Sequence, residues 1–252
     1  QAGRLLERLL RQDGLNFRLN TKVTGAENAG SAVRLFLEPG DGVQEEAEFD
    51  RVLIAVGRRP LVHGFGIDEL GIRLDSRGFV MVDEDYRTNI PGVYAIGDLA
   101  PGPMLAHKAS AEGIAAVERI AGLASELNYD AIPAVIYTSP EAASVGKTEE
   151  ELKSLGVEYG SAVFPFRGTA RAQCLGETDG FVKILAHSRS GRILGVHIVG
   201  QRASELIAEC VIAIKSHMSA EELSRAVHAH PTLSEAVHES AAILLKGQKN
   251  KN

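Results

Sequence analysis

The sequence predicts α/β segments followed by an α+β domain with an antiparallel sheet. An apolar run at residues 49–56 ends in Gly57, and a later short strand ends in Gly97-Asp98, as buried strands of an open α/β sheet often do. From about residue 127, five strand candidates follow one another with turn residues between them, and helices come after them. This second pattern is typical of an α+β domain.

Composition limits the possible functions. The chain has 252 residues, with 27 basic and 33 acidic side chains and a net charge of −6. It contains no Lys/Arg run that would follow a phosphate backbone, and no apolar stretch approaches the roughly 20 residues that cross a bilayer. We therefore expect neither a nucleic-acid nor a membrane partner. Because the chain starts at Gln1 without an initiator methionine, we expect a piece of a longer polypeptide.

The first elements are a helix and three strands. Residues 2–12 place leucines on one face and charged side chains on the other, which predicts an amphipathic helix that ends at Asp13-Gly14. Strands are expected at residues 21–24, 32–37 and 49–56. The last is apolar throughout, as in a strand that is buried on both faces.

The next stretch contains a candidate ligand site. Short strands are expected at residues 79–83 and 93–96, and the second ends in Gly97-Asp98. A carboxylate in that position can accept a hydrogen bond from a ligand hydroxyl, although Gly-Asp is also a common turn dipeptide. Residues 101–107 are expected to open a helix that runs through Ile120, and its N-terminus would suit an electron-rich group.

The region after residue 127 supplies the antiparallel sheet. The five strand candidates are residues 134–137, 142–146, 160–164, 180–185 and 193–199, and Thr148-x-x-Glu151 and Ser219-x-x-Glu222 are capping boxes. Arg167 and Arg171 could bind an anion, but in a loop we favour solvated side chains. The two cysteines, Cys174 and Cys210, form no Cys-x-x-Cys or Cys-x-x-x-x-Cys pair, and we expect Cys210 to be a buried thiol.

The octapeptide His228-Ala-His-Pro-Thr-Leu-Ser-Glu235 carries most of the functional signal. Proline pushes His230 out of the α region, so its side chain can point towards a partner just outside a helix. Thr232-x-x-Glu235 has capping-box spacing, which is the more common use of such a glutamate. The same carboxylate could instead hold the His230 imidazole.

The octapeptide resembles the active-site segment of the pyridine nucleotide-disulfide oxidoreductase family, and its residue sequence looks most like that of the family's lipoamide-oxidising members. That resemblance implies that His230 is the acid/base for the substrate thiol and that Glu235 orients it, with Pro231 beside the cofactor. Gly97-Asp98 followed by Met104-Leu-Ala-His107 is similar to the family's second FAD motif. It implies that Asp98 binds the ribityl chain, and the residues expected along the flavin are Met104, Leu105, Ala106 and His107. Residues 55–60 resemble the passage between the NAD and FAD domains, where Val56 and Gly57 would line the nicotinamide side.

The resemblance also implies the organisation and partners of the chain. Residues 1–57 would be the last part of an NAD-binding domain, residues 58–126 the last part of an FAD-binding domain and residues 127–252 a complete interface domain. The implied cofactors are FAD and NAD, and the implied partners are a second copy of the chain, whose flavin His230 would serve, and the lipoyl-bearing acyltransferase of a 2-oxo acid dehydrogenase complex. We expect the bacterial cytoplasm or the mitochondrial matrix.

Several alternatives stay open. The chain could belong to a mercuric, glutathione or trypanothione reductase, although residues 247–252 contain no cysteine pair for mercury. It could also be a dimerisation and docking module, or an unrelated α+β domain. Since the redox cysteines and both dinucleotide fingerprints of the family are absent from these residues, we expect them to be inactive alone.

Overall fold

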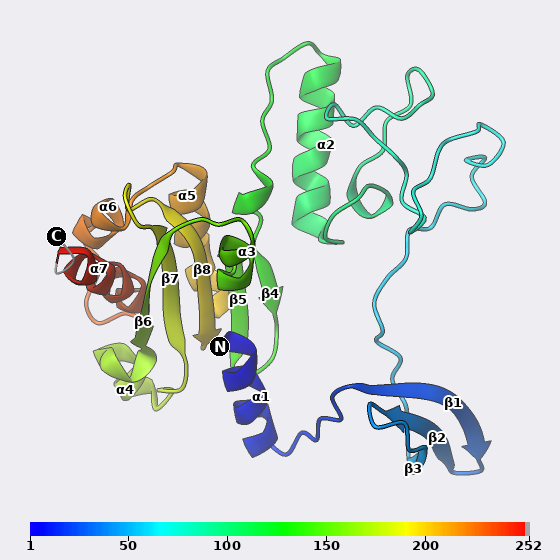
Figure 1. Ribbon diagram of the computed structural model, residues 1–252, viewed down its shortest axis with the longest axis horizontal. Coiled ribbons are helices and arrows are strands. Elements are labelled where there is room, and N and C mark those ends of the chain that lie inside the picture. The colour runs from blue at the N-terminus through cyan, green and yellow to red at the C-terminus, as the bar shows by residue number, and fades with distance from the viewer. Residues whose placement is uncertain (250–252) are drawn as a thin grey trace. The chain divides into compact units, whose positions relative to one another are not determined.

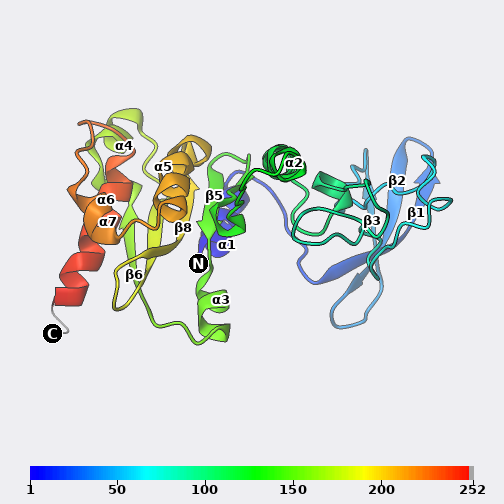
Figure 2. The same ribbon diagram turned by 90° about the horizontal axis from the view of Figure 1, so that it is seen from above.

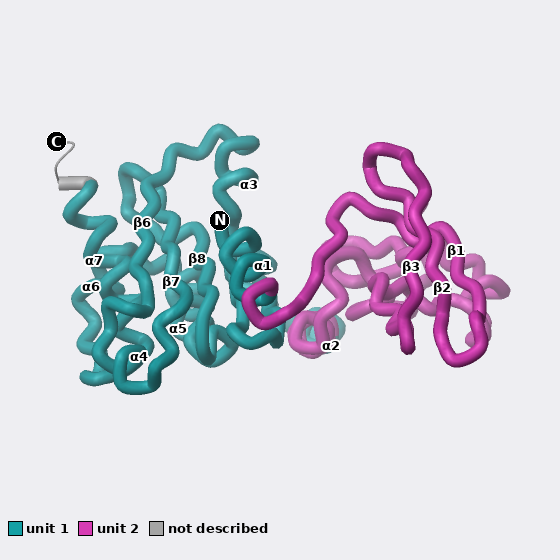
Figure 3. The backbone as a smooth tube through the Cα atoms, turned by 90° about the horizontal axis from the view of Figure 1, so that it is seen from below, with its two compact units in different colours: residues 1–10, 117–252 teal, residues 11–116 magenta. Residues whose placement is uncertain are grey.

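The computed structural model describes residues 1–249. Two compact units make up the chain, one of residues 1–10 and 117–252 and one of residues 11–116 (Figure 3). The last three residues of the expected interface domain, 250–252, lie outside the described part.

The larger unit is built on one antiparallel sheet, shown with its helices in Figure 1. Its five strands lie in the order β4-β5-β8-β7-β6, and every neighbouring pair is antiparallel. The strands are β4 (Ala134–Ile136), β5 (Glu141–Gly146), β6 (Tyr159–Pro165), β7 (Phe181–His187) and β8 (Ile193–Gly200). The sequence prediction of an antiparallel sheet in this region is therefore confirmed.

Two helices cover one face of this sheet. Helix α5 (Ala203–Lys215) packs on β5 and β8, and α7 (Glu235–Lys249) packs on β6 and β7 (Figure 2). Val182 and Ile184 of β7 are fully buried in the core beneath them. Lys183, which alternates with them, forms an ion pair with Glu149. Side chains alternate between the two faces of a strand, so Val182 and Ile184 share one core with the helices, and Lys183 lies on the other face.

Short helices complete the unit. They are α3 (Glu149–Ser154), α4 (Ala170–Leu175) and α6 (Ala220–Arg225), and the amphipathic helix α1 (Ala2–Gln12) begins the chain. The predicted capping boxes are present, with Thr148 and Glu151 at α3 and Ser219 and Glu222 at α6. Each box satisfies two backbone N–H donors and one hydroxyl at its helix start, so these ends are fixed by local sequence.

The smaller unit has a three-stranded antiparallel sheet, β1-β2-β3. Its strands are β1 (Thr21–Ala29), β2 (Ala32–Pro39) and β3 (Glu45–Phe49). Helix α2 (Ala106–Ile120) begins within residues 101–107, the segment predicted to open it. The expected strands at 79–83 and 93–96 are reduced to isolated bridges, Leu74 to Val80 and Arg87 to Tyr94.

The predicted strand at residues 49–56 is wrong. Strand β3 ends at Phe49, and the residues beyond it have no regular structure. The side chains of Leu53 and Val56 are 89% and 93% exposed. An apolar run becomes a buried strand only when other strands pair with its backbone and other layers cover its faces, and no described strand pairs with this one. No helix in the described residues is both long and apolar enough to span a membrane.

A glycine substitution tests the packing of the five-stranded sheet. A Cβ added to Gly195 would lie 2.0 Å from the Lys147 carbonyl oxygen. We expect Gly195→Ala to lower the free energy of unfolding by about 2 kcal/mol, because the backbone of β8 and the backbone that follows β5 would have to move apart. Urea unfolding would measure this, with the exposed Ser161→Ala on β6 as a control within about 0.5 kcal/mol of the parent. Equal stability of the two variants would contradict the packing argument.

Candidate active site

The site centres on the His230-Glu235 pair at the start of α7. His230 Nδ1 lies 2.9 Å from Glu235 Oε1. The carboxylate accepts, so Nδ1 carries the hydrogen and Nε2 keeps its lone pair. The His230 side chain is 69% exposed, whereas that of Glu235 is 24% exposed. The geometry is that of an imidazole held at one nitrogen and able to take a proton at the other.

Glu235 performs both roles that the sequence left as alternatives. Its Oε2 accepts from the Thr232 backbone N–H at 2.8 Å, as a capping glutamate does, while Oε1 accepts from His230. The pKa of Glu235 is lowered, chiefly by the Thr232 amide and next by His230. The Thr232 hydroxyl donates to the Ala229 carbonyl at 2.7 Å, so it faces back along the loop.

The preceding histidine is a participant that the sequence reasoning missed. His228 Nε2 lies 3.0 Å from Glu209 Oε2 on α5, and its side chain is 10% exposed. Glu209 lies on a separate helix outside the octapeptide, so no spacing within the octapeptide could reveal this contact. Only the packing of α5 brings the two together.

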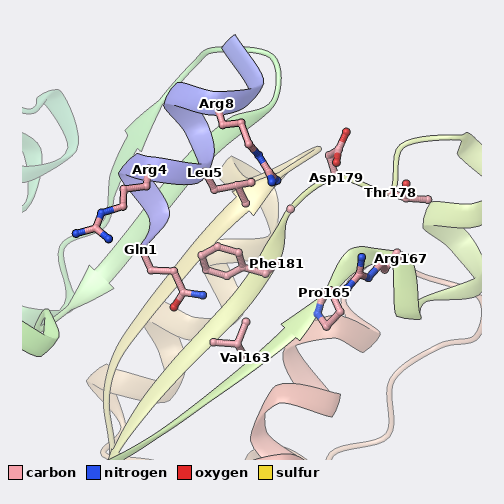
Figure 4. Close-up of a pocket in the computed structure, with 11 residues that line it drawn as sticks. Gln1, Arg4, Leu5, Arg8, Val163, Pro165, Arg167, Thr178, Asp179 and Phe181 are labelled. Atoms are coloured by element: carbon pink, nitrogen blue, oxygen red, sulfur yellow. The ribbon is translucent and has the colours of Figure 1, made fainter. Parts of the chain in front are cut away.

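The two loop arginines, Arg167 and Arg171, line two different cavities of the larger unit. Arg171 lines a cavity of about 820 Å³ beside Pro231 and Leu233. Arg167 lines another of about 610 Å³ with Arg8 of α1 and Phe181 of β7 (Figure 4). Both arginines are exposed. The two arginines do not share a cavity, and their exposure is what the prediction of solvated side chains expects.

The second predicted site lies in the smaller unit. Asp98 occupies a short 3-10 turn, Gly97–Leu99, and its carboxylate is 43% exposed and 3.5 Å from the Arg58 guanidinium. Met104 and Leu105 are half-buried before α2, whereas Ala106 and His107 are exposed in its first turn. An accessible carboxylate and the positive end of a helix dipole thus belong to one compact unit, which fits a group with both hydroxyls and an electron-rich edge.

A buried ion pair that the sequence reasoning also missed fixes this turn. Lys108 and Glu112 are 0% and 1% exposed, and their charged atoms are 3.1 Å apart. Glu112 accepts from the Gly97 N–H at 2.7 Å, and Lys108 donates to the Gly97 carbonyl at 3.0 Å. Gly97 has φ +66°, and a Cβ there would meet Ala109 at 2.9 Å. The i, i+4 position of both charges on the stripe that contains Ala115 and Ala116 was the available signal.

The remaining predicted residues are accessible or inert. Val56 is 93% exposed, and Gly57 has φ +105° in the same irregular segment. Pro231 is exposed, and its peptide bond to His230 is cis. Cys210 is fully buried, which raises the pKa of its thiol, as expected for a structural cysteine. The described residues contain no group of three or more potential metal ligands.

Comparisons with known proteins identify the family. Residues 1–113 match "Pyridine nucleotide-disulphide oxidoreductase" and residues 132–241 match "Pyridine nucleotide-disulphide oxidoreductase, dimerisation domain". The chain therefore belongs to the pyridine nucleotide-disulphide oxidoreductase family.

Its curated relatives narrow the comparison. The chain is similar to leghemoglobin reductase of Vigna unguiculata, with 49% identity over 93% of the chain and 45% of the relative. It is similar to mitochondrial dihydrolipoyl dehydrogenase of Pisum sativum, with 47% identity over 93% of the chain and 47% of the relative. The crystal structure of LpdA from Mycobacterium tuberculosis superposes with a TM-score of 0.88 and 28% identity, covering 96% of this chain and 52% of that one. The chain thus spans about half the length of the relatives it matches.

The buried ion pair yields a stability prediction. We expect Lys108→Met to lower the free energy of unfolding of the smaller unit by about 3 kcal/mol, because it leaves the Glu112 carboxylate buried without its counter-charge. The exposed Lys22→Met on β1 is the matched control and should change stability by less than about 0.5 kcal/mol. Urea unfolding would compare them. A loss below about 1 kcal/mol for Lys108→Met would contradict the role given to the pair.

Proposed function

We propose that the chain is the C-terminal portion of an FAD-dependent dihydrolipoyl dehydrogenase, which oxidises dihydrolipoamide with NAD⁺ in 2-oxo acid dehydrogenase complexes. The observation that carries the proposal is the His230 Nδ1 to Glu235 hydrogen bond beside an exposed imidazole. Relatives named dihydrolipoyl dehydrogenase in pea, cow and nematode, at 46% to 47% identity, support this choice of substrate.

His230 acts as the acid/base in this mechanism. Its Nε2 lone pair takes the proton of a dihydrolipoyl thiol, which leaves a thiolate as the nucleophile. The Glu235 carboxylate keeps the hydrogen on Nδ1 and favours the imidazolium that results. In the reverse direction, the same nitrogen returns the proton. Overall, two thiols become a disulfide, two electrons and one proton pass to NAD⁺, and a second proton is released.

Residues of the smaller unit would hold the flavin. Asp98 would accept from a ribityl hydroxyl, and the start of α2, with Met104, Leu105, Ala106 and His107, would lie along the ring system. FAD, when bound, supplies an acceptor for the electron pair between the thiols and NAD⁺. Val56 and Gly57 would lie on the nicotinamide side, where a glycine permits close approach.

A relative's name gives a second candidate. Leghemoglobin reductase of cowpea matches at 49% identity and that of soybean at 47%. Reduction of a haem protein needs no proton transfer from a substrate thiol. A parallel assay with each substrate separates the two functions, because only thiol-linked turnover requires His230.

Replacing the base tests the proposal. In the full-length enzyme, we expect His230→Gln to lower lipoamide-linked turnover by roughly 10²- to 10⁴-fold, the loss that follows removal of a positioned acid/base. Reduction of an artificial acceptor by NADH should change much less. His187→Gln, at the β7-β8 turn, is the control. Near-parent lipoamide turnover in His230→Gln would remove this residue from the mechanism.

The oligomeric state tests the organisation. The larger unit exposes large apolar side chains, with Ile136 at 55%, Tyr137 at 79% and Val227 at 99%. A homodimer would cover such residues and bring His230 to the partner's flavin. Light scattering on this 26.9 kDa chain should therefore give about twice that mass. A monomeric mass at micromolar concentration would count against dimerisation through this unit.

A further inference from the structure

His228 lies between two groups that accept hydrogen bonds. Its Nδ1 is 3.0 Å from the Ala226 carbonyl oxygen, and its Nε2 is 3.0 Å from Glu209 Oε2. A carbonyl only accepts, so Nδ1 carries a hydrogen. The other contact then needs a second proton, either on Nε2 or on the Glu209 carboxyl. In both arrangements, the pair holds one proton more than a neutral imidazole beside an ionised carboxylate.

The His228-Glu209 pair is largely buried between α5 and α7. The His228 side chain is 10% exposed and that of Glu209 is 32% exposed. Burial raises the pKa of Glu209, and the hydrogen bond from His228 opposes that rise. The His238 ring of α7 lies 5.3 Å from the His228 ring, and its buried Nδ1 has no hydrogen-bond partner among the described residues. The segment that leads to His230 is thus attached to α5 and lies against α7.

We propose that Glu209 and His228 form a second carboxylate-histidine pair, which positions the segment at residues 226–231 so that His230 stands correctly at Glu235. Neither residue touches the reacting atoms; both are positioning residues. His228 anchors the segment two residues before the base, and Glu235 anchors it at the base itself. As a role within catalysis, this inference rests on the proposed function.

The shared proton gives the device a pH dependence. The titratable groups that face His228 are Glu209 on α5 and His238 and Glu235 on α7. On α6, Arg225 is paired with Glu221. Burial raises the pKa of Glu209, and when the pH rises far enough for Glu209 to lose its proton, Nε2 of His228 faces an acceptor without a hydrogen. One of the two bonds is then lost and the segment loosens.

Substitutions at Glu209 in the full-length enzyme test the pair. Glu209→Ala removes the acceptor, and we expect kcat for lipoamide to fall about tenfold or more with KM nearly unchanged, because small misplacements of a catalytic group have large effects. In Glu209→Gln, the amide can donate to Nε2 of a neutral His228 while Nδ1–H still donates to Ala226. This variant should recover turnover to within about threefold of the parent. Glu221→Ala, which removes an exposed carboxylate of α6, is the matched control.

Hydrogen exchange gives a readout that is independent of activity. Amides of residues 226–231 should exchange faster in Glu209→Ala than in the parent, and in the parent they should gain exchange at high pH beyond the intrinsic effect. Unchanged exchange and turnover in Glu209→Ala would overturn the inference, as would a Glu209→Gln variant as impaired as Glu209→Ala. If Glu209→Ala fails to fold, the parent's pH series and Glu209→Gln still decide. Normal turnover in His230→Gln would instead refute the proposed function and leave the exchange test standing.

Discussion

The position of the His230 imidazole depends on two carboxylates carried by two helices that pack on one sheet. Glu209 belongs to α5 and Glu235 begins α7, and both helices are held by the core over β7 and β8. Residues 226–231, which carry His230, have little apolar burial of their own, since Val227 is 99% exposed. Their order therefore comes from polar contacts to a rigid scaffold, which is how a loop can hold a catalytic group precisely.

The smaller unit solves a similar problem with a different polar device. The Lys108-Glu112 pair lies in the interior and bonds both backbone groups of Gly97, so the turn that carries Asp98 has one preferred position. A buried pair contributes little net stability over apolar residues, because its desolvation is costly. Its value here is specificity. With both backbone groups of Gly97 bonded, the accessible carboxylate of Asp98 is held just before the start of α2. No apolar side chain could form these bonds to Gly97.

The sequence could predict what local patterns determine. Strand-like runs separated by turn residues predicted the five strands of the larger unit, and Ser/Thr-x-x-Glu spacing predicted the starts of α3 and α6. The His230-Glu235 pair was within reach because both members lie in one octapeptide. Glu209 lies 19 residues from His228, and only tertiary packing joins them. The strand prediction at residues 49–56 was wrong because an apolar pattern alone does not supply pairing partners, and none of the described strands pairs with residues 50–56.

The two histidines of the octapeptide show how surroundings assign different work to one side chain. His228 is 10% exposed and has an acceptor at each nitrogen, so its ring and its carboxylate hold a proton between them and have no nitrogen left for a substrate. His230 is 69% exposed, and Glu235 is the acceptor at its Nδ1, so Nε2 keeps a lone pair. One ring therefore has both nitrogens occupied and anchors its segment, and under the proposed function the other, with Nε2 open, is the one that can act as a base.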